Sequence, residues 1–297
     1  MVKEGRSLQA SLGSHVSIAG GLAKAIERAG ELGCNTLQCF GGNPRGWKQR
    51  KLTKAEATDF REARKKAGLN AVVIHASYLI NLSSPDDELF NRSIELLKIE
   101  LLRADEVGAD FLVIHLGSGL GSGPDFVLKR VVGAFKSVSK LLDDLSVELL
   151  LENTAGSGHT TGAKLTDIKA IIEAYEKGRN KGKGKKSSIG FCLDTCHAFA
   201  AGYPMKSKRE ALAFIDKVDK EIGLARLKVI HLNDSKGALA SHLDRHEHIG
   251  EGMIGLTGFR AFLSDRRIRG IPLILETPKK SEADDPRNIA VVKKMIK

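Results

Sequence analysis

Eight short apolar runs recur along the chain, and longer amphipathic segments separate them. The runs are rich in Val, Ile and Leu, and most lack the alternation of apolar and polar residues that marks a half-exposed strand. This pattern is typical of parallel strands that are covered on both faces. The runs span residues 8–17, 35–40, 71–76, 110–117, 147–153, 189–195, 227–234 and 271–277.

The segments between the runs carry apolar residues near i, i+3, i+4 and i+7, which predicts helices with one buried face. These helices are expected over residues 20–33, 86–108, 125–145, 164–178, 208–223 and 256–265. Strands that alternate with helices predict an α/β fold, and eight such units predict a closed (β/α)₈ TIM barrel rather than an open sheet. Because no linker divides the chain, we expect a single domain over residues 1–297.

One segment departs from this pattern. Residues 177–188, "KGRNKGKGKKSS", are rich in Gly and Lys and come just before the sixth run. Because they follow a helix and precede a strand, we expect them on the face of the barrel opposite the active site. No substrate contact is therefore assigned to them.

The apolar runs end on polar residues, and three of them end on the same tripeptide, "VIH", at residues 73–75, 113–115 and 229–231. In a TIM barrel the C-terminal ends of the strands meet at one mouth, where the chemistry takes place. A crowd of ionisable groups at that mouth is costly to desolvate unless something neutralises them, and metal ions do so. The residues at the eight ends are His15, Gln38, His75, His115, Glu152, Asp194, His231 and Glu276.

Two short motifs nearby add further candidate ligands. In "DTCH", Asp194 and His197 are one helical turn apart if the chain enters a helix there. In "DRH", Asp244 and His246 are two residues apart, on one side of an extended loop. The same segment contains His242 and His248, which we interpret as exposed loop residues rather than ligands.

Five imidazoles and four carboxylates favour zinc over Mg²⁺ or Ca²⁺, although Mn²⁺ or Fe²⁺ would also suit one or more positions. Nine ligands exceed the roughly four of one tetrahedral zinc site, so two or three ions with shared carboxylates are implied. Three divalent ions and four carboxylates leave a net charge of roughly +2 at the mouth, which favours an anionic substrate such as a phosphate.

The composition of the chain is consistent with a polyanionic partner and indicates a cellular compartment. The formal net charge is +11 at pH 7, and 42% of the residues are hydrophobic. No apolar stretch approaches the roughly 20 residues of a membrane span, and the first ten residues do not read as a secretory signal. The four cysteines form no CxxC pair, which favours a reducing, cytoplasmic location.

Eight motifs together resemble the endonuclease IV family of zinc-dependent apurinic/apyrimidinic endonucleases. They lie in the family's order between about residues 11 and 277: "GSHVSIAGGL", "NPRGW", "HASYLINL", "LENTAG", "CLDTCHAFAAGY", "HLNDSK", "DRHEHIGEGMIG" and "PLILET". The resemblance implies three zinc ions. Their ligands would be, in turn, His75, His115 and Glu152; Glu152, Asp194, His231 and Glu276; and His197, Asp244 and His246.

The resemblance also implies an activity in DNA base-excision repair. The family hydrolyses the phosphodiester 5′ to an abasic site in double-stranded DNA and removes blocking groups from 3′ ends. The implied mechanism is in-line attack by a zinc-bound hydroxide, with Glu152 orienting the nucleophile. The protein would be a cytoplasmic monomer, associated with the nucleoid in a prokaryote.

Residues that match the family's DNA-contacting loops are Arg45 in "NPRGW" and Tyr78 and Leu79 in "SYLINL". They would enter the minor groove and help to expel the abasic sugar, at a step where a missing base lowers the cost of unstacking. Trp47 is interpreted as a packing residue instead. The chain departs from the family at Ala76, where an acid is common, at "HLGS" after the fourth run, and in the segment 177–188.

Two other functions would account for only part of this residue set. A metal-dependent sugar isomerase or epimerase of similar barrel design would use Glu152, Asp194, His231 and Glu276, but it leaves "DTCH" and "DRH" without a role. A DNA-binding module without enzymatic activity would be expected to lack at least one ligand, and none is missing.

Overall fold

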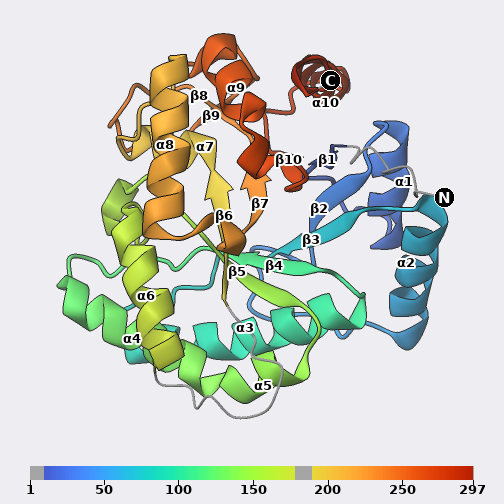
Figure 1. Cartoon of the computed structure of the whole chain (residues 1–297). Coiled ribbons are helices and arrows are strands. Elements are labelled where there is room, and N and C mark those ends of the chain that lie inside the picture. The colour runs from blue at the N-terminus through green and yellow to red at the C-terminus, as the bar shows by residue number, and fades with distance from the viewer. Residues whose placement is uncertain (1–9, 178–188, 297) are drawn as a thin grey trace, which may run out of the picture.

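A computed structural model describes residues 10–177 and 189–296 (Figure 1). Eight parallel strands form one sheet in the order β1-β10-β7-β6-β5-β4-β3-β2. All eight lie within the predicted runs. They are β1 (Leu12–Ser14), β2 (Thr36–Phe40), β3 (Ala71–His75), β4 (Phe111–Ile114), β5 (Glu148–Glu152), β6 (Gly190–Asp194), β7 (Leu227–His231) and β10 (Leu273–Leu275).

The sheet closes into a barrel between its first and second strands. His15 and Gln38 form a parallel bridge just beyond β1, and the Val16 N–H donates to the Gln38 carbonyl at 2.7 Å. Gly13 is required here, because a Cβ at that position would lie only 2.2 Å from the carbonyl oxygen of Thr36 on β2. The predicted single-domain TIM barrel is therefore confirmed, whereas its extent over residues 1–297 stays a prediction.

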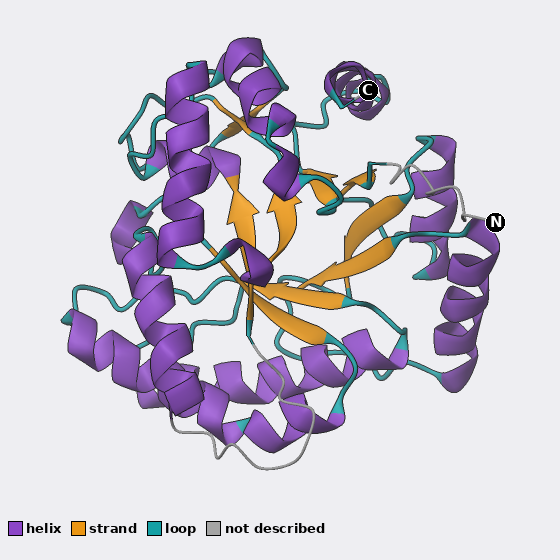
Figure 2. Cartoon of the chain, viewed as in Figure 1, coloured by secondary structure: helices purple, strands orange, loops and turns teal. Residues whose placement is uncertain are grey.

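Helices surround the strands, which occupy the centre of the molecule (Figure 2). A two-stranded hairpin of β8 (Asp234–Ser235) and β9 (His246–Glu247) follows β7. The helices are α1 (Ala23–Glu31), α2 (Lys54–Ala67), α3 (Asp87–Glu106), α4 (Pro124–Ser137), α5 (Ser139–Asp144), α6 (Leu165–Lys177), α7 (Thr195–Ala200), α8 (Lys208–Glu221), α9 (Gly255–Ser264) and α10 (Asp284–Met295).

The six predicted helices are all present, with one of them divided. The helix expected over residues 125–145 forms α4 and α5, which meet at Val138, whose backbone leaves the helical region at φ −106° and ψ 6°. Two long helices, α2 and α10, were not predicted. The segment 177–188 was expected on the opposite face of the barrel, and all of it except Lys177 lies outside the described residues.

Apolar side chains form two layers. An inner cluster fills the barrel and takes one residue from each of six strands, namely Val73, Val113, Leu150, Cys192, Val229 and Ile274. A larger outer cluster lies between the barrel and the helices. The inner cluster forms a floor on which residues at the strand ends rest. Among the described helices, none has both the length and the apolar character that a membrane crossing requires.

Candidate metal centre

Six of the nine candidate ligands are placed by the alternation of side chains along a strand. Successive residues of a strand point to opposite faces, so residues two apart share a face. Each residue of the inner cluster is followed, two positions later, by a candidate ligand: His75, His115, Glu152, Asp194, His231 and Glu276. All six therefore project into the barrel above its apolar floor, at the C-terminal ends of the strands.

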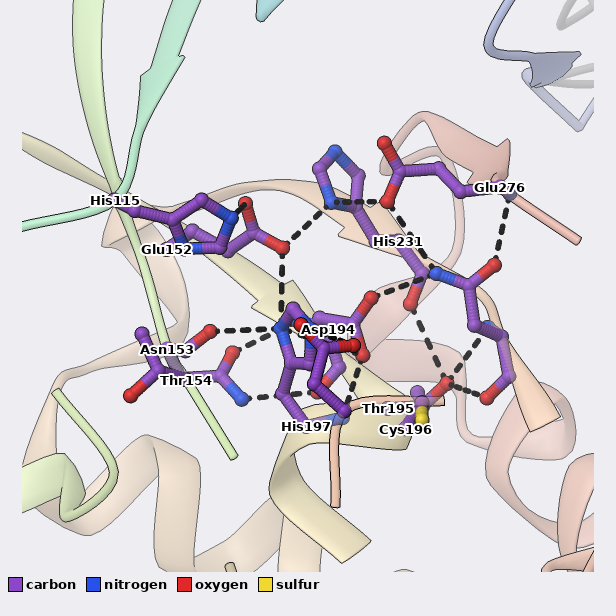
Figure 3. A network of polar contacts seen from close by, with 12 residues as sticks. His115, Glu152, Asn153, Thr154, Asp194, Thr195, Cys196, His197, His231 and Glu276 are labelled. Atoms are coloured by element: carbon purple, nitrogen blue, oxygen red, sulfur yellow. Dashed lines mark hydrogen bonds and ion pairs between the residues drawn. The ribbon is translucent and has the colours of Figure 1, made fainter. Parts of the chain in front are cut away.

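Glu152 lies at the centre of this group, and its side chain is 1% exposed. Its Oε2 is 3.3 Å from Nε2 of both His75 and His115. Its Oε1 is 2.9 Å from Nδ1 of His231 and 3.4 Å from Nδ1 of His197. Figure 3 shows the Glu152 carboxylate between the rings of His115, His231 and His197.

The remaining ligand candidates come from α7, from the loop before β9 and from β9 itself. Asp194 is the N-cap of α7, where its Oδ1 accepts from the His197 N–H at 2.7 Å, so the helix begins at this carboxylate. The loop returns to the same place. Asp244 Oδ1 lies 3.1 Å from His197 Nε2 and 3.7 Å from His246 Nε2, which is itself 3.6 Å from Asp194 Oδ2.

Backbone carbonyls fix the orientation of three histidine rings. A carbonyl oxygen only accepts, so the ring nitrogen facing it carries the proton and the other nitrogen presents a lone pair. In each case Nδ1 donates to the carbonyl, and Nε2 is left as the ligating atom. The pairs are His75 with Ala76 at 2.8 Å, His197 with Asn153 at 3.0 Å and His246 with Glu276 at 2.9 Å.

This arrangement fits divalent metal ions. His246 Nε2 is buried and has no hydrogen-bond partner among the described residues, which is costly unless a cation takes its lone pair. Three groups of donor atoms lie within 4.8 Å of one another, close enough for one ion each. They are His75, His115 and Glu152; Glu152, Asp194, His231 and Glu276; and Asp194, His197 and His246.

The first two groups match two of the predicted ligand sets. The third contains Asp194 where the prediction has Asp244; Asp194 is fully buried beside both histidines, whereas the Asp244 side chain is 54% exposed. Asp244 remains within 3.7 Å of His246 and His197, so both carboxylates face this pair of rings.

Charges in the pocket also favour a cation. Burial alone raises the pKa of Glu152, but the rings of His115 and His231 outweigh it and the pKa lies well below its usual range. Burial lowers the pKa of His115 to about 4, which keeps that imidazole neutral. At His197 burial is outweighed by carboxylates, above all Asp194, which raise the pKa. A metal ion binds neutral imidazoles and ionised carboxylates, and would displace such a proton.

Two asparagines hold Asp194 and were not predicted. Asp194 N–H donates to Asn153 Oδ1 at 2.8 Å, and Asn153 Nδ2 donates to the Asp194 carbonyl at 3.0 Å. Asn233 Nδ2 donates to Asp194 Oδ2 at 2.6 Å, and Asn233 Oδ1 accepts from the Glu276 N–H at 2.8 Å. Each asparagine lies one or two residues after a strand-end ligand, in "LENT" and "HLND", and that position is the signal that identifies it.

One histidine was assigned wrongly. His248 was expected on an exposed loop, but it is 8% exposed and its Nδ1 pairs with Asn288 Nδ2 at 3.0 Å. It packs beneath α10, a helix that was not predicted, and it belongs to none of the three donor groups. His242 is exposed, as expected, and its Nδ1 donates to the Ala155 carbonyl at 2.9 Å.

The centre opens into a pocket of about 360 Å³ at the barrel mouth, lined by Tyr78 and Phe40 among others. Tyr78 is 59% exposed, and its ring meets that of Phe40 edge-on at 5.2 Å. Its N–H donates to the Pro44 carbonyl at 3.2 Å, which joins the two loops that contain the predicted DNA contacts. Arg45 is exposed, whereas Leu79 is partly buried against the core.

Two further expectations concern neighbours of this pocket. Trp47 is partly buried against the outer core, and the Arg92 guanidinium lies over its ring at 4.3 Å, as expected of a packing residue. Ala76 replaces an acid that is common in the resembled family. The backbone carbonyl of Ala76 accepts from His75, so the ring keeps this anchor with alanine in place.

Comparison with known proteins agrees with this geometry. Residues 22–296 match the family described as "Xylose isomerase-like TIM barrel". "Probable endonuclease 4" of Halothermothrix orenii is 44% identical over 92% of this chain and 95% of its own length. The protein of the same name from Methanoculleus marisnigri is 43% identical over 96% of this chain and 98% of its own.

A solved structure supports the same relationship. Endonuclease IV from Thermus thermophilus superimposes with a TM-score of 0.82 at 36% identity, over 96% of this chain and 98% of that one. Each of these alignments covers nearly the whole length of both proteins, so the similarity includes nearly the whole barrel. The chain therefore belongs to the endonuclease IV family of xylose isomerase-like TIM barrels.

Proposed function

We propose that the chain is an apurinic/apyrimidinic endonuclease, which hydrolyses the phosphodiester 5′ to an abasic site in double-stranded DNA. The observation that carries the proposal is the convergence of nine ligand-type side chains on one open pocket, in a member of the endonuclease IV family. A sugar isomerase or epimerase would need only the four ligands around Glu152, Asp194, His231 and Glu276.

The proposed centre would hold three zinc ions. One would be bound by His75, His115 and Glu152, a second by Glu152 with Asp194, His231 and Glu276, and a third by His197, Asp244 and His246. The mixture of imidazoles and carboxylates favours zinc, with Mn²⁺ or Fe²⁺ as alternatives at one or more positions. Among these residues Asp244 has a largely accessible side chain, 54% exposed, so it would be a ligand that substrate can approach.

Bound divalent ions supply Lewis acidity, which ionises water at neutral pH and neutralises charge on the phosphate. Glu152 stays ionised and accepts a hydrogen bond from the attacking water, which orients the water toward phosphorus. The new P–O bond forms as the bond from phosphorus to the 3′-oxygen breaks, and the proton passes to that oxygen. The products are a 3′-hydroxyl and a 5′-deoxyribose phosphate.

DNA would be held by the loops at the mouth. Arg45 lies in a loop that also contains Lys48, Arg50 and Lys51, in a chain of net charge +11, and such clusters bind phosphates. Tyr78 extends from the pocket wall into solvent, and Leu79 lies next to it. These three residues, Arg45, Tyr78 and Leu79, would enter the minor groove beside the abasic sugar.

The test is incision of an end-labelled duplex with one abasic site by the zinc-loaded protein. We expect one cut, 5′ to the site, with 3′-hydroxyl and 5′-deoxyribose phosphate ends, and no cut in the intact duplex. A lack of incision, or the unsaturated 3′ end left by β-elimination, would contradict the proposal. A duplex with a blocked 3′ end tests the end-cleaning activity. We also propose that the protein is monomeric and located in the cytoplasm.

A further inference from the structure

Gln38 is a fully buried amide at the end of β2, directly beside the candidate metal centre. An amide at this place is not a ligand that zinc favours. Its side chain nevertheless has three polar neighbours. Nε2 lies 2.6 Å from Glu276 Oε1 and 3.0 Å from His15 Nδ1, and Oε1 lies 2.8 Å from His231 Nε2.

The chemistry of Glu276 fixes which way this amide points. A carboxylate that binds a metal ion is ionised and only accepts hydrogen bonds, and Glu276 Oε1 lies 2.6 Å from the Gln38 amide. The NH₂ group of Gln38 must therefore face Glu276. Its oxygen then has to face His231, because the two ends of one planar amide point in different directions.

The amide oxygen in turn fixes the proton on His231. An amide oxygen only accepts, so His231 Nε2 must carry the proton that it receives at 2.8 Å. Nδ1 is then the nitrogen that faces the centre, 2.9 Å from Glu152 Oε1 and 3.2 Å from Glu276 Oε2, where a metal ion would displace the proton that it shares with these carboxylates. His75, His197 and His246 show the reverse arrangement, with Nδ1 bound to a carbonyl and Nε2 facing the centre.

We infer that Gln38 is a positioning residue that sets His231 to bind metal through Nδ1 while it orients Glu276 for the same ion. The inference rests on the proposed function, because it concerns the ion shared by Glu152, Asp194, His231 and Glu276. One side chain thus prepares two of that ion's four ligands. Without it, the imidazole would be free to flip, and Glu276 would lose its shortest hydrogen bond.

The test replaces Gln38 with methionine, which is similar in length and provides neither the donor nor the acceptor. Zinc affinities are measured by competition with a coloured chelator. We expect Gln38→Met to weaken one of the three ions by roughly 10- to 100-fold, the usual effect of losing such a partner, and to leave the other two unchanged. Binding of abasic duplex by the metal-loaded protein should change little.

A second readout follows the His231 ring directly. Long-range ¹H–¹⁵N NMR of the zinc-loaded protein should show His231 with a hydrogen-bonded Nε2 proton in the wild type. This signal should disappear in Gln38→Met and survive in Gln38→Glu, whose carboxylate still accepts from Nε2. Gln38→Glu also serves as the second variant if methionine prevents folding.

A matched control is Asn288→Leu, which removes another buried amide from a histidine, His248, outside the centre. This change should lower stability without altering zinc affinity. The inference is overturned if Gln38→Met keeps all zinc affinities and the His231 Nε2 signal. Because neither readout depends on cleavage, failure of the wild type to incise DNA would refute the proposed function separately.

Discussion

At the residue scale, the contacts of the centre converge on Glu152. Its two oxygens face four imidazoles, and the side chain is almost completely buried. A carboxylate that touches two donor groups is suited to bridge two ions and to orient a water between them. Removal of its charge should therefore affect turnover more than substrate binding.

Glu152→Gln tests this role. The amide keeps the size of the side chain but lacks the negative charge, so we expect turnover of abasic duplex to fall by about 10²- to 10⁴-fold, the usual range for a lost acid or base. The dissociation constant for the duplex should stay within a few-fold. Glu148→Gln, at the opposite end of β5, is the control. Turnover equal to that of the wild type would remove Glu152 from the mechanism.

A second residue-scale prediction concerns Glu100 on α3, which is 2% exposed. Burial raises its pKa from 4.5 to about 7, although Arg103 partly offsets the rise. The pKa of Glu100 is higher in the folded state than in the unfolded state. The resulting stabilisation of the fold is therefore fully present below about pH 4.5 and is lost as the pH rises through about 7. Between pH 5 and 8 the loss is about 2 kcal/mol.

The Glu100→Gln variant cannot titrate at this position. Chemical denaturation of both proteins at pH 5 and pH 8, in the same zinc concentration, measures the difference. We expect the free energy of unfolding of the variant to fall less with pH than that of the wild type. Identical pH dependence in the two proteins would show that Glu100 is ionised in the folded state at pH 5.

The candidate ligands could be picked out from the sequence because each ends an apolar run or falls within a close-spaced motif. Their partners could not be predicted in the same way. Gln38 stood among the strand ends, but its role depends on which end of an amide faces Glu276. Likewise, the burial of His248 depends on Asn288, forty residues away in the sequence.

At the scale of elements, α3 supports the loop that contains Arg45. The Arg103 guanidinium donates to the Gly41 carbonyl at 2.7 Å and also to the carbonyl of Arg50, so it holds both ends of the loop. Hydrogen bonds from a charged group contribute about 1.5–3 kcal/mol each. Arg103 is 8% exposed and does not line the pocket. It therefore acts on DNA only through the loop.

Arg103→Met should loosen this loop and raise KM for abasic duplex roughly tenfold, while kcat changes less than threefold. Steady-state kinetics of incision separate the two constants. Lys98→Met is the control, because Lys98 lies on the same helix and, among the residues described, its ion pair is with Glu95. If kcat falls as much as kcat/KM, then Arg103 supports the metal centre rather than the DNA-binding loop.

The strands were predictable as elements because long apolar runs are distinctive, whereas two helices were missed. The segment of α2 is mostly charged and buries only Ala57 and Phe60, so its apolar face is too narrow to recognise. Its beginning did carry a signal, a capping box in which Thr53 and Glu56 each accept from the other's N–H. At α10 the buried residues are Asn288, Ile289 and Val292, again a narrow face.

At the scale of the whole molecule, the barrel brings distant parts of the chain to one point. The candidate ligands lie between residues 75 and 276, at the ends of six barrel strands, on the short helix α7, in the loop before β9 and on β9. The positions of these residues at the ends of successive predicted strands already predicted that they would converge, because the C-terminal ends of parallel strands lie at one mouth of the barrel. The positions of Asp194 and Asp244 relative to the third donor group could not be predicted, because they depend on how the loop before β9 returns to α7.

The most direct test of the central claim is a zinc titration of metal-free protein, with metal content and incision of abasic duplex measured on the same samples. We predict three zinc ions per chain at saturation. Incision should be absent in the metal-free protein and should rise fully only as the last ion binds. Incision that persists after verified removal of all metal would contradict the account.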